Sequence, residues 1–129
     1  VASWAASVDA SRKLSAIGPA GQADRQCDVP GFGTITESLH VFDETRKTFA
    51  YDVIEGRPGM VTALGNTWTI EPVDAQRTSI SFRIQVEVKP LPKALMGWMM
   101  KRNMEKLADS ICEDLSVYLE TGKPRAAAA

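Results

Sequence analysis

The sequence predicts a single α+β domain in which a curved antiparallel sheet wraps around a long C-terminal helix. The chain has 129 residues, of which 44% are apolar and 24% charged, as expected for one globular domain with a core. Residues 22–89 alternate apolar and polar side chains between turn residues, which is typical of antiparallel strands. Residues 91–120 repeat apolar side chains at helical spacing instead. Because both elements have one apolar side, we expect them to pack together with a ligand cavity between them.

The first 21 residues predict no clear element. They are mixed, rich in Ala and Ser, and end in the loop signal Gly-Pro-Ala-Gly at 18–21. The strands that follow are predicted from the alternation and from the turn residues that interrupt it. We expect strands over 23–29, 34–42, 49–54, 64–70 and 79–89, with turns at 30–32, 43–47, 55–59 and 74–77.

Alternation also predicts which side chains of each strand face inward. The clearest case is residues 79–89, where every second residue is apolar and the others are polar. The apolar row consists of Ile80, Phe82, Ile84, Val86 and Val88. By the same pattern, we expect Leu39, Trp68 and Phe82 to line the cavity wall.

The C-terminal segment predicts one long helix with a single apolar stripe. Apolar residues recur there at intervals of three and four, and charged residues fill the other positions. The stripe consists of Met96, Met100, Met104, Leu107, Ile111, Leu115 and Tyr118. Such methionines are more often plain core, but their flexibility also suits a cavity wall, for which Met100, Met104 and Leu107 are candidates. Asn103 borders the stripe and could face inward or toward solvent.

Four polar residues interrupt the predicted inner face. If the turn is at 30–32, Arg25 lies opposite Glu37, and the two can form a cross-strand ion pair. Such a pair could anchor the polar end of a ligand or could be a structural salt bridge, and the sequence supports both equally. Tyr51 and Asn66 intrude in the same way, and each could bond either a ligand or an enclosed water.

Composition argues against several functions. The formal net charge is −1 with both signs mixed along the chain, which favours neither nucleic acid nor an anionic membrane as a partner, and no apolar run is long enough for a membrane span. His40 is the only histidine and is expected on the wet face, so we expect no metal, no cofactor and no histidine-based nucleophile. Cys27 and Cys112 show no metal-ligand spacing, and two cysteines make no disulfide framework, so the cytoplasm is the expected location.

A succession of short motifs points to a known family. It runs Arg25, Gly33-x-Ile35-x-Glu37-x-Leu39, Phe42-Asp43, Tyr51 and Asn66-x-Trp68-x-Ile70, followed by the long amphipathic helix. In its order and spacing, from Trp4 to Gly122, the chain resembles the START-like superfamily and, within it, the polyketide cyclase/dehydrase-type (SRPBCC) proteins. The resemblance implies a helix-grip fold with a cavity for lipids, sterols, polyketides or plant hormones.

The resemblance also implies two loops at the cavity entrance. In the similar plant abscisic-acid receptors, a Gly-Leu-Pro loop gates the cavity, a glutamate shortly after it points inward, and a second loop acts as a latch. By this match, Glu37 is expected on the inner wall. The gate-like loop would be Pro30, Gly31 and Phe32, and the latch-like loop would be Gly56, Arg57 and Pro58.

The family normally begins with a strand and a short helix before the region that matches Trp4. The resemblance therefore predicts a single domain over residues 1–122 that is incomplete at its N-terminus, followed by a flexible tail over 123–129. The missing edge strand could lie upstream of Val1 or come from a partner chain, as in a homodimer.

Three functions fit these features. The leading hypothesis is the binding of a hydrophobic or amphipathic small molecule, because apolar walls surround a few polar groups and no catalytic constellation is recognisable. The alternative is a cyclase or dehydratase that uses Glu37 or Tyr51 as acid or base without a metal. A third is a protein-interaction module whose groove holds a peptide. The candidate ligand-binding residues are Arg25, Glu37, Leu39, Tyr51, Asn66, Trp68, Phe82, Met100, Asn103, Met104 and Leu107.

Overall fold

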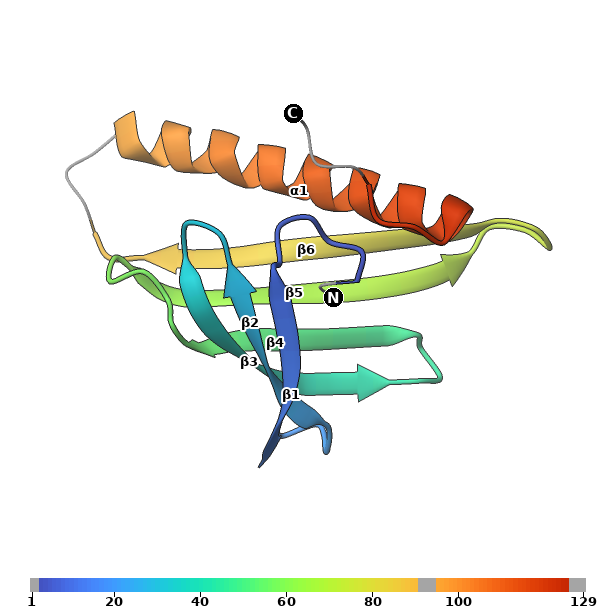
Figure 1. Ribbon diagram of the computed structural model, residues 1–129, viewed down its shortest axis with the longest axis horizontal. Helices are drawn as coiled ribbons and strands as arrows, with labels where there is room; N and C mark the ends of the chain where they lie inside the picture. Colours follow the sequence, from blue (N-terminus) through green and yellow to red (C-terminus); the bar gives the residue numbers. More distant parts are fainter. Residues whose placement is uncertain (1–2, 91–94, 126–129) are drawn as a thin grey trace.

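The computed structural model describes residues 3–90 and 95–125, which form one antiparallel sheet and one long helix (Figure 1). Each strand pairs with its neighbours in the sequence, so the sheet is a simple meander in the order β1-β2-β3-β4-β5-β6. The elements are β1 (Ala10–Ile17), β2 (Ala23–Val29), β3 (Gly33–Asp43), β4 (Thr48–Glu55), β5 (Val61–Pro72), β6 (Thr78–Val88) and α1 (Leu95–Thr121). The expected start of the helix at 91–94, the side chain of Met96 and the end of the tail at 126–129 lie outside the described residues.

Strand β1 was not predicted from the sequence. It is an edge strand with mostly exposed side chains, and only Ser11 and Leu14 are half-buried. A strand whose two faces are both exposed to solvent needs no alternation of apolar and polar residues. The alternation that predicts the other strands is therefore absent from β1. Arg12 and Lys13 in its centre are typical of an edge strand that is protected by charge.

The sheet bends at β3. The pairing of β3 with β4 shifts register between Thr36 and Glu37 and again between Leu39 and Val41. Such bulges bend a strand and increase its local twist. Figure 1 shows the result, in which β4, β5, β6 and the end of β3 run along the helix, while β1, β2 and the start of β3 cross them steeply.

The buried core lies on the inner face of the sheet, between the bend and the N-terminal segment. Cys27, Ile35 and Val53 form its centre, and Val8 from the segment before β1 packs against them. Farther along the inner face, Trp68 stacks on Phe82 with ring centroids 4.6 Å apart. Aromatic pairs in this geometry contribute about 0.5–1.5 kcal/mol beyond their buried area.

The second half of α1 is tied to the N-terminal segment through a fully buried carboxylate. Asp114 Oδ2 accepts a hydrogen bond from the backbone N–H of Ala6 at 2.8 Å, and Oδ1 accepts one from Arg125 Nε at 2.6 Å. Arg125 also pairs with Glu113. A buried carboxylate persists only when it is paired and hydrogen-bonded in this way. Arg125, in the segment predicted to be a flexible tail, therefore folds back onto the helix, while Asp114 makes the contact with the N-terminal segment.

The apolar stripe of α1 is only partly covered. Among the helix side chains that the structure describes, Asp114 alone is fully buried, while Met100, Met104, Leu107 and the later residues of the stripe are half-buried. A helix packed closely on a sheet would bury this stripe. Space therefore remains between the helix and β6. No helix within 3–90 and 95–125 has the length and hydropathy needed to cross a bilayer.

Candidate functional site

The site is built on a row of inner-face residues that crosses the sheet. The turn at 30–32 sets the register, so that Val29 lies opposite Gly33 and Arg25 lies opposite Glu37, as predicted. On the next strands, Tyr51 lies opposite Asn66. These four polar side chains come from β2, β3, β4 and β5 and gather on one face of the sheet.

Arg25 and Glu37 form an ion pair on this face. Arg25 Nε donates to Glu37 Oε2 at 2.7 Å, and Nη2 of the same guanidinium contacts the same oxygen. The side chains are 25% and 9% exposed, respectively. The thiol of Cys27 lies 3.6 Å from the same oxygen. Because Arg25 neutralises the carboxylate at short range, the pair can stay inside the domain without an external counter-charge.

Tyr51 connects this ion pair to Asn66. The guanidinium of Arg25 lies 5.6 Å from the centre of the Tyr51 ring, and the Tyr51 hydroxyl accepts a hydrogen bond from Asn66 Nδ2 at 3.4 Å. Burial and the nearby charge of Glu37 raise the pKa of Tyr51. The hydroxyl is therefore protonated at neutral pH and can donate a hydrogen bond to a ligand.

Asn66 leaves one polar atom without a partner. The residue is 7% exposed, and its Oδ1 is buried with no hydrogen bond from any described residue. A buried amide oxygen that lacks a donor costs about 1–3 kcal/mol. An atom of this kind is a natural acceptor for a hydroxyl or amine of a bound molecule.

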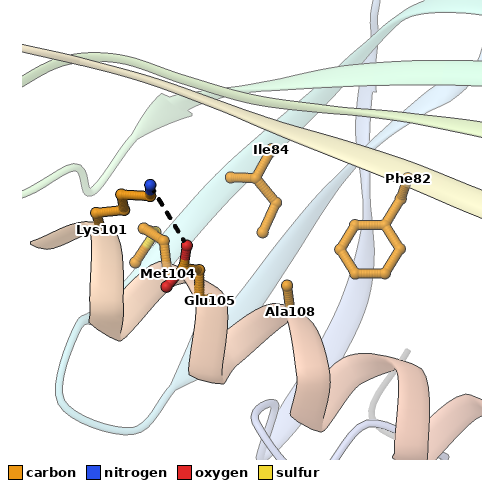
Figure 2. Close-up of a pocket in the computed structure, with 6 residues that line it drawn as sticks. All are labelled: Phe82, Ile84, Lys101, Met104, Glu105 and Ala108. Carbon is orange, nitrogen blue, oxygen red and sulfur yellow. Dashed lines mark ion pairs between the residues drawn. The ribbon is translucent and has the colours of Figure 1, made fainter.

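An apolar groove of about 300 Å³ lies beside this row, between β6 and α1 (Figure 2). Figure 2 shows Phe82 and Ile84 on the strand side and Met104 and Ala108 on the helix side. At the rim, Lys101 Nζ and Glu105 Oε1 lie 3.8 Å apart. Its floor is apolar and its rim carries charge, the combination found in many small-molecule sites. The groove is open to solvent along one side, whereas the sequence predicted an enclosed cavity.

The pairing of β5 with β6 joins the groove to the polar row. Asn66 lies opposite Ile84, and Trp68 lies opposite Phe82. Both groove residues of β6 therefore have a predicted site residue as their direct neighbour. A ligand in the groove would lie one strand away from the free amide oxygen of Asn66.

The structure separates the other predicted residues into two groups. Leu39, Met100 and Leu107 are half-buried but do not line the groove, and Asn103 is exposed on the helix and does not belong to the site.

Four groove residues were not among the candidates: Ile84, Lys101, Glu105 and Ala108. Ile84 belonged to the predicted apolar row, and Ala108 follows Met104 by one helical turn, so both could have been found from spacing.

The two loops that the resemblance places at the entrance meet at one end of the sheet. Gly56 packs so closely on β3 that an added Cβ would clash with the carbonyl oxygen of Thr34. Arg57 Nη1 donates to the carbonyl of Val53 at 2.7 Å, which holds the second loop in place. Phe32, at the tip of the first loop, is 44% exposed.

Metal ligation has no support in the described part of the chain, where no three His, Cys, Asp or Glu side chains converge. His40 lies on the exposed face, with Nδ1 3.2 Å from Asp52 Oδ2. Both side chains are substantially exposed, which makes this contact a weak surface interaction.

Comparisons with known proteins agree with this architecture. Residues 1–115 match the sequence profile of the family described as polyketide cyclase / dehydrase and lipid transport. The solved structure of the protein XoxI from Bacillus cereus is similar in fold, with a TM-score of 0.52 and 18% sequence identity over 86% of this chain and 78% of that chain. No curated protein matches the chain.

Proposed function

Since the chain belongs to the polyketide cyclase/dehydrase and lipid transport family, we propose that it binds a hydrophobic or amphipathic small molecule in the groove between β6 and α1. The observation that carries this proposal is the incomplete burial of the helix. Its apolar stripe faces the apolar row of β6, yet side chains on both sides of the groove remain half-exposed. Apolar surface of this kind is stabilised when a ligand covers it.

The polar groups favour a ligand with one hydrogen-bond donor. An apolar body would lie against Phe82 and Met104, and binding would bring its hydroxyl or amine to the buried Oδ1 of Asn66, to which no described residue donates. The Arg25–Glu37 pair is internally neutralised, so it favours an uncharged polar group over a free carboxylate. The ligand class we propose is therefore a hydroxylated lipid, sterol or polyketide.

The volume limits the size of the ligand. A groove of about 300 Å³ is at the lower end of the range for small-molecule sites, so one part of a longer ligand would fit inside it. The open side allows the remainder to extend past the ion pair of Lys101 and Glu105 at the rim.

Two matched helix variants test the proposal. Ala108 lines the groove, whereas its neighbour Asp109 is exposed on another side of the helix. In a thermal-shift screen with hydroxylated fatty acids, sterols and aromatic polyketides, the original chain should gain several degrees with at least one class. The variant A108W should fill the groove and lose that gain, and D109W should keep it. If no class raises the melting temperature, or if A108W and D109W respond alike, the groove is not the binding site.

A further inference from the structure

Positive charge is concentrated in the segment that ends β6 and begins α1. Residues 89–106 contain five basic side chains and one acidic side chain, a net charge of +4 within a chain whose formal net charge is −1. The basic residues are Lys89, Lys93, Lys101, Arg102 and Lys106. The near-neutral net charge of the whole chain predicted no anionic-membrane partner, but it hides this local excess of positive charge. A local basic cluster attracts anionic surfaces whatever the charge of the rest of the chain.

Large apolar side chains are exposed beside these basic residues on the outer side of the helix. Trp98 is 59% exposed and Met99 is 53% exposed. The guanidinium of Arg102 lies 5.6 Å from the centre of the Trp98 ring, one turn along the helix, and Lys106 follows one turn later. We call Trp98, Met99, Arg102 and Lys106 the basic aromatic face. Tryptophan beside Arg and Lys on one side of an amphipathic helix is typical of helices that lie at a lipid–water interface.

Two loops add exposed apolar side chains at the same end of the domain. The backbone N–H of Lys89 donates to the carbonyl of Met60 at 2.9 Å, so the loop before β5 adjoins the end of β6. Met60 is 39% exposed, and Phe32 in the turn before β3 is 44% exposed. Figure 1 shows the end of β6, the start of β5 and the start of α1 together at the left of the molecule.

The basic aromatic face adjoins the rim of the groove at Lys101 and Glu105, but none of its residues lines the groove. Met104 and Ala108 point toward β6 in Figure 2, whereas Trp98, Arg102 and Lys106 are exposed and lie on another side of the helix. Substitutions on the face can therefore be made without changing the groove lining.

We propose that the first half of α1 docks on an anionic lipid bilayer through the basic aromatic face. Trp98 and Met99 would enter the headgroup region, and Arg102 and Lys106 would lie near lipid phosphates. A bilayer fits better than an acidic protein because the exposed apolar side chains project from a helix and two separate loops, whereas a protein interface has a continuous apolar centre. The proposal does not depend on ligand binding, although it would bring the groove close to a source of lipid.

Vesicle binding tests this proposal with the whole chain. In co-sedimentation at low ionic strength, the chain should bind vesicles of phosphatidylcholine mixed with phosphatidylglycerol, bind phosphatidylcholine alone weakly, and dissociate when salt is raised. R102E/K106E should lower the affinity by about tenfold or more, because it reverses two charges near the surface. R83E/K123E makes the same change in charge at exposed positions outside the face and should bind as the original chain does.

Two further readouts separate docking through this face from binding through the rest of the surface. Because the chain has three tryptophans, the shift of tryptophan fluorescence to shorter wavelength on binding should be seen in the original chain and be lost in W98A. W98A should also bind less than L119A, which removes a similarly exposed apolar side chain at the far end of α1. A108W should still bind vesicles, even if ligand binding is lost. Equal vesicle binding by R102E/K106E and R83E/K123E would overturn the proposal. Tighter binding to polyglutamate than to the anionic vesicles would also overturn it, because the face would then be a site for acidic chains.

Discussion

Asn66 on β5 lies directly opposite Ile84 on β6, which places a buried amide oxygen, to which no described residue donates, beside an apolar residue of the groove. A buried amide oxygen without a donor lowers the stability of the folded chain. A bound ligand with a hydroxyl would donate the missing hydrogen bond to Asn66 Oδ1. Asn66 should therefore matter more for binding than for folding.

Replacing Asn66 by Leu should separate stability from binding. N66L removes a buried oxygen that has no partner, at the expense of one long hydrogen bond to Tyr51. We expect the free energy of unfolding in urea to stay equal or rise by about 1 kcal/mol. Affinity for a hydroxylated ligand should fall about 5- to 10-fold in calorimetric titration, the value of one hydrogen bond. A large loss of stability with unchanged affinity would show that Asn66 is purely structural.

The Arg25–Glu37 pair should behave as a coupled unit. E37Q leaves the guanidinium of Arg25 without its counter-charge. We expect the free energy of unfolding to fall by about 2–4 kcal/mol. The loss is smaller than for a fully buried pair because a quarter of the Arg25 side chain is exposed. The double variant R25M/E37L replaces both charges by apolar groups and should recover most of this loss. Urea denaturation of R25M, E37L and R25M/E37L measures the coupling. Simple addition of the two single effects would contradict it.

The two cysteines should differ in reactivity. Burial and the neighbouring carboxylate of Glu37 raise the pKa of the Cys27 thiol, and the residue is only 1% exposed, whereas Cys112 is exposed. A thiol-specific disulfide reagent should therefore label one thiol quickly and the second only after unfolding. In C112S the fast phase should vanish. Fast labelling of native C112S would mean that Cys27 is accessible.

Tyr51 should ionise at higher pH in the native chain than in the unfolded chain. Burial is the main cause, followed by the charge of Glu37. Y118F leaves Tyr51 as the one remaining tyrosine, so its ultraviolet titration can be compared directly in native and urea-unfolded samples. Since the native pKa is the higher one, Tyr51 contributes stability that is fully present below the unfolded pKa near 10.0 and is lost as pH rises through the native pKa. Coincident titrations would show that the hydroxyl is solvated.

Two glycines with the same backbone angle should differ in their tolerance of alanine. Gly31 and Gly56 both have φ of 80°, but a Cβ at Gly31 would meet nothing within 4 Å, whereas one at Gly56 would meet the carbonyl oxygen of Thr34. G31A should lower the free energy of unfolding by about 1 kcal/mol, because alanine is strained in the left-handed conformation. G56A should lose about 3 kcal/mol or more, because the loop must also move. Equal losses in chemical denaturation would remove the evidence that this loop is held against β3.

The sequence predicted most of the sheet because five of its strands have one wet face and one apolar face. The same alternation predicted that Arg25 would meet Glu37, since the turn at 30–32 determines the pairing of β2 with β3. The family resemblance is confirmed by the profile match over residues 1–115, and the predicted fold is confirmed by the sheet, the helix and the similar solved structure.

Three features of the structure were not predicted, because no local pattern in the sequence determines them. The β1 strand has no apolar alternation, so only its pairing with β2 identifies it. Periodicity predicted the apolar stripe of α1, but it gives no distance between the helix and β6, and for this reason an open groove was expected to be a closed cavity. The contact of Asp114 with Ala6 joins residues that are far apart in the sequence, and no local pattern indicates it.

Nuclear magnetic resonance can show whether a ligand lies between β6 and α1 and is hydrogen-bonded by Asn66. A uniformly labelled chain would be titrated with the hydroxylated ligand that raises its melting temperature most. We expect saturable shifts of the Ile84 and Met104 methyl signals and of the Asn66 side-chain amide, with no change at Val41 or Leu119 outside the groove. Saturable binding that leaves Ile84, Met104 and Asn66 unchanged would contradict ligand binding at this groove.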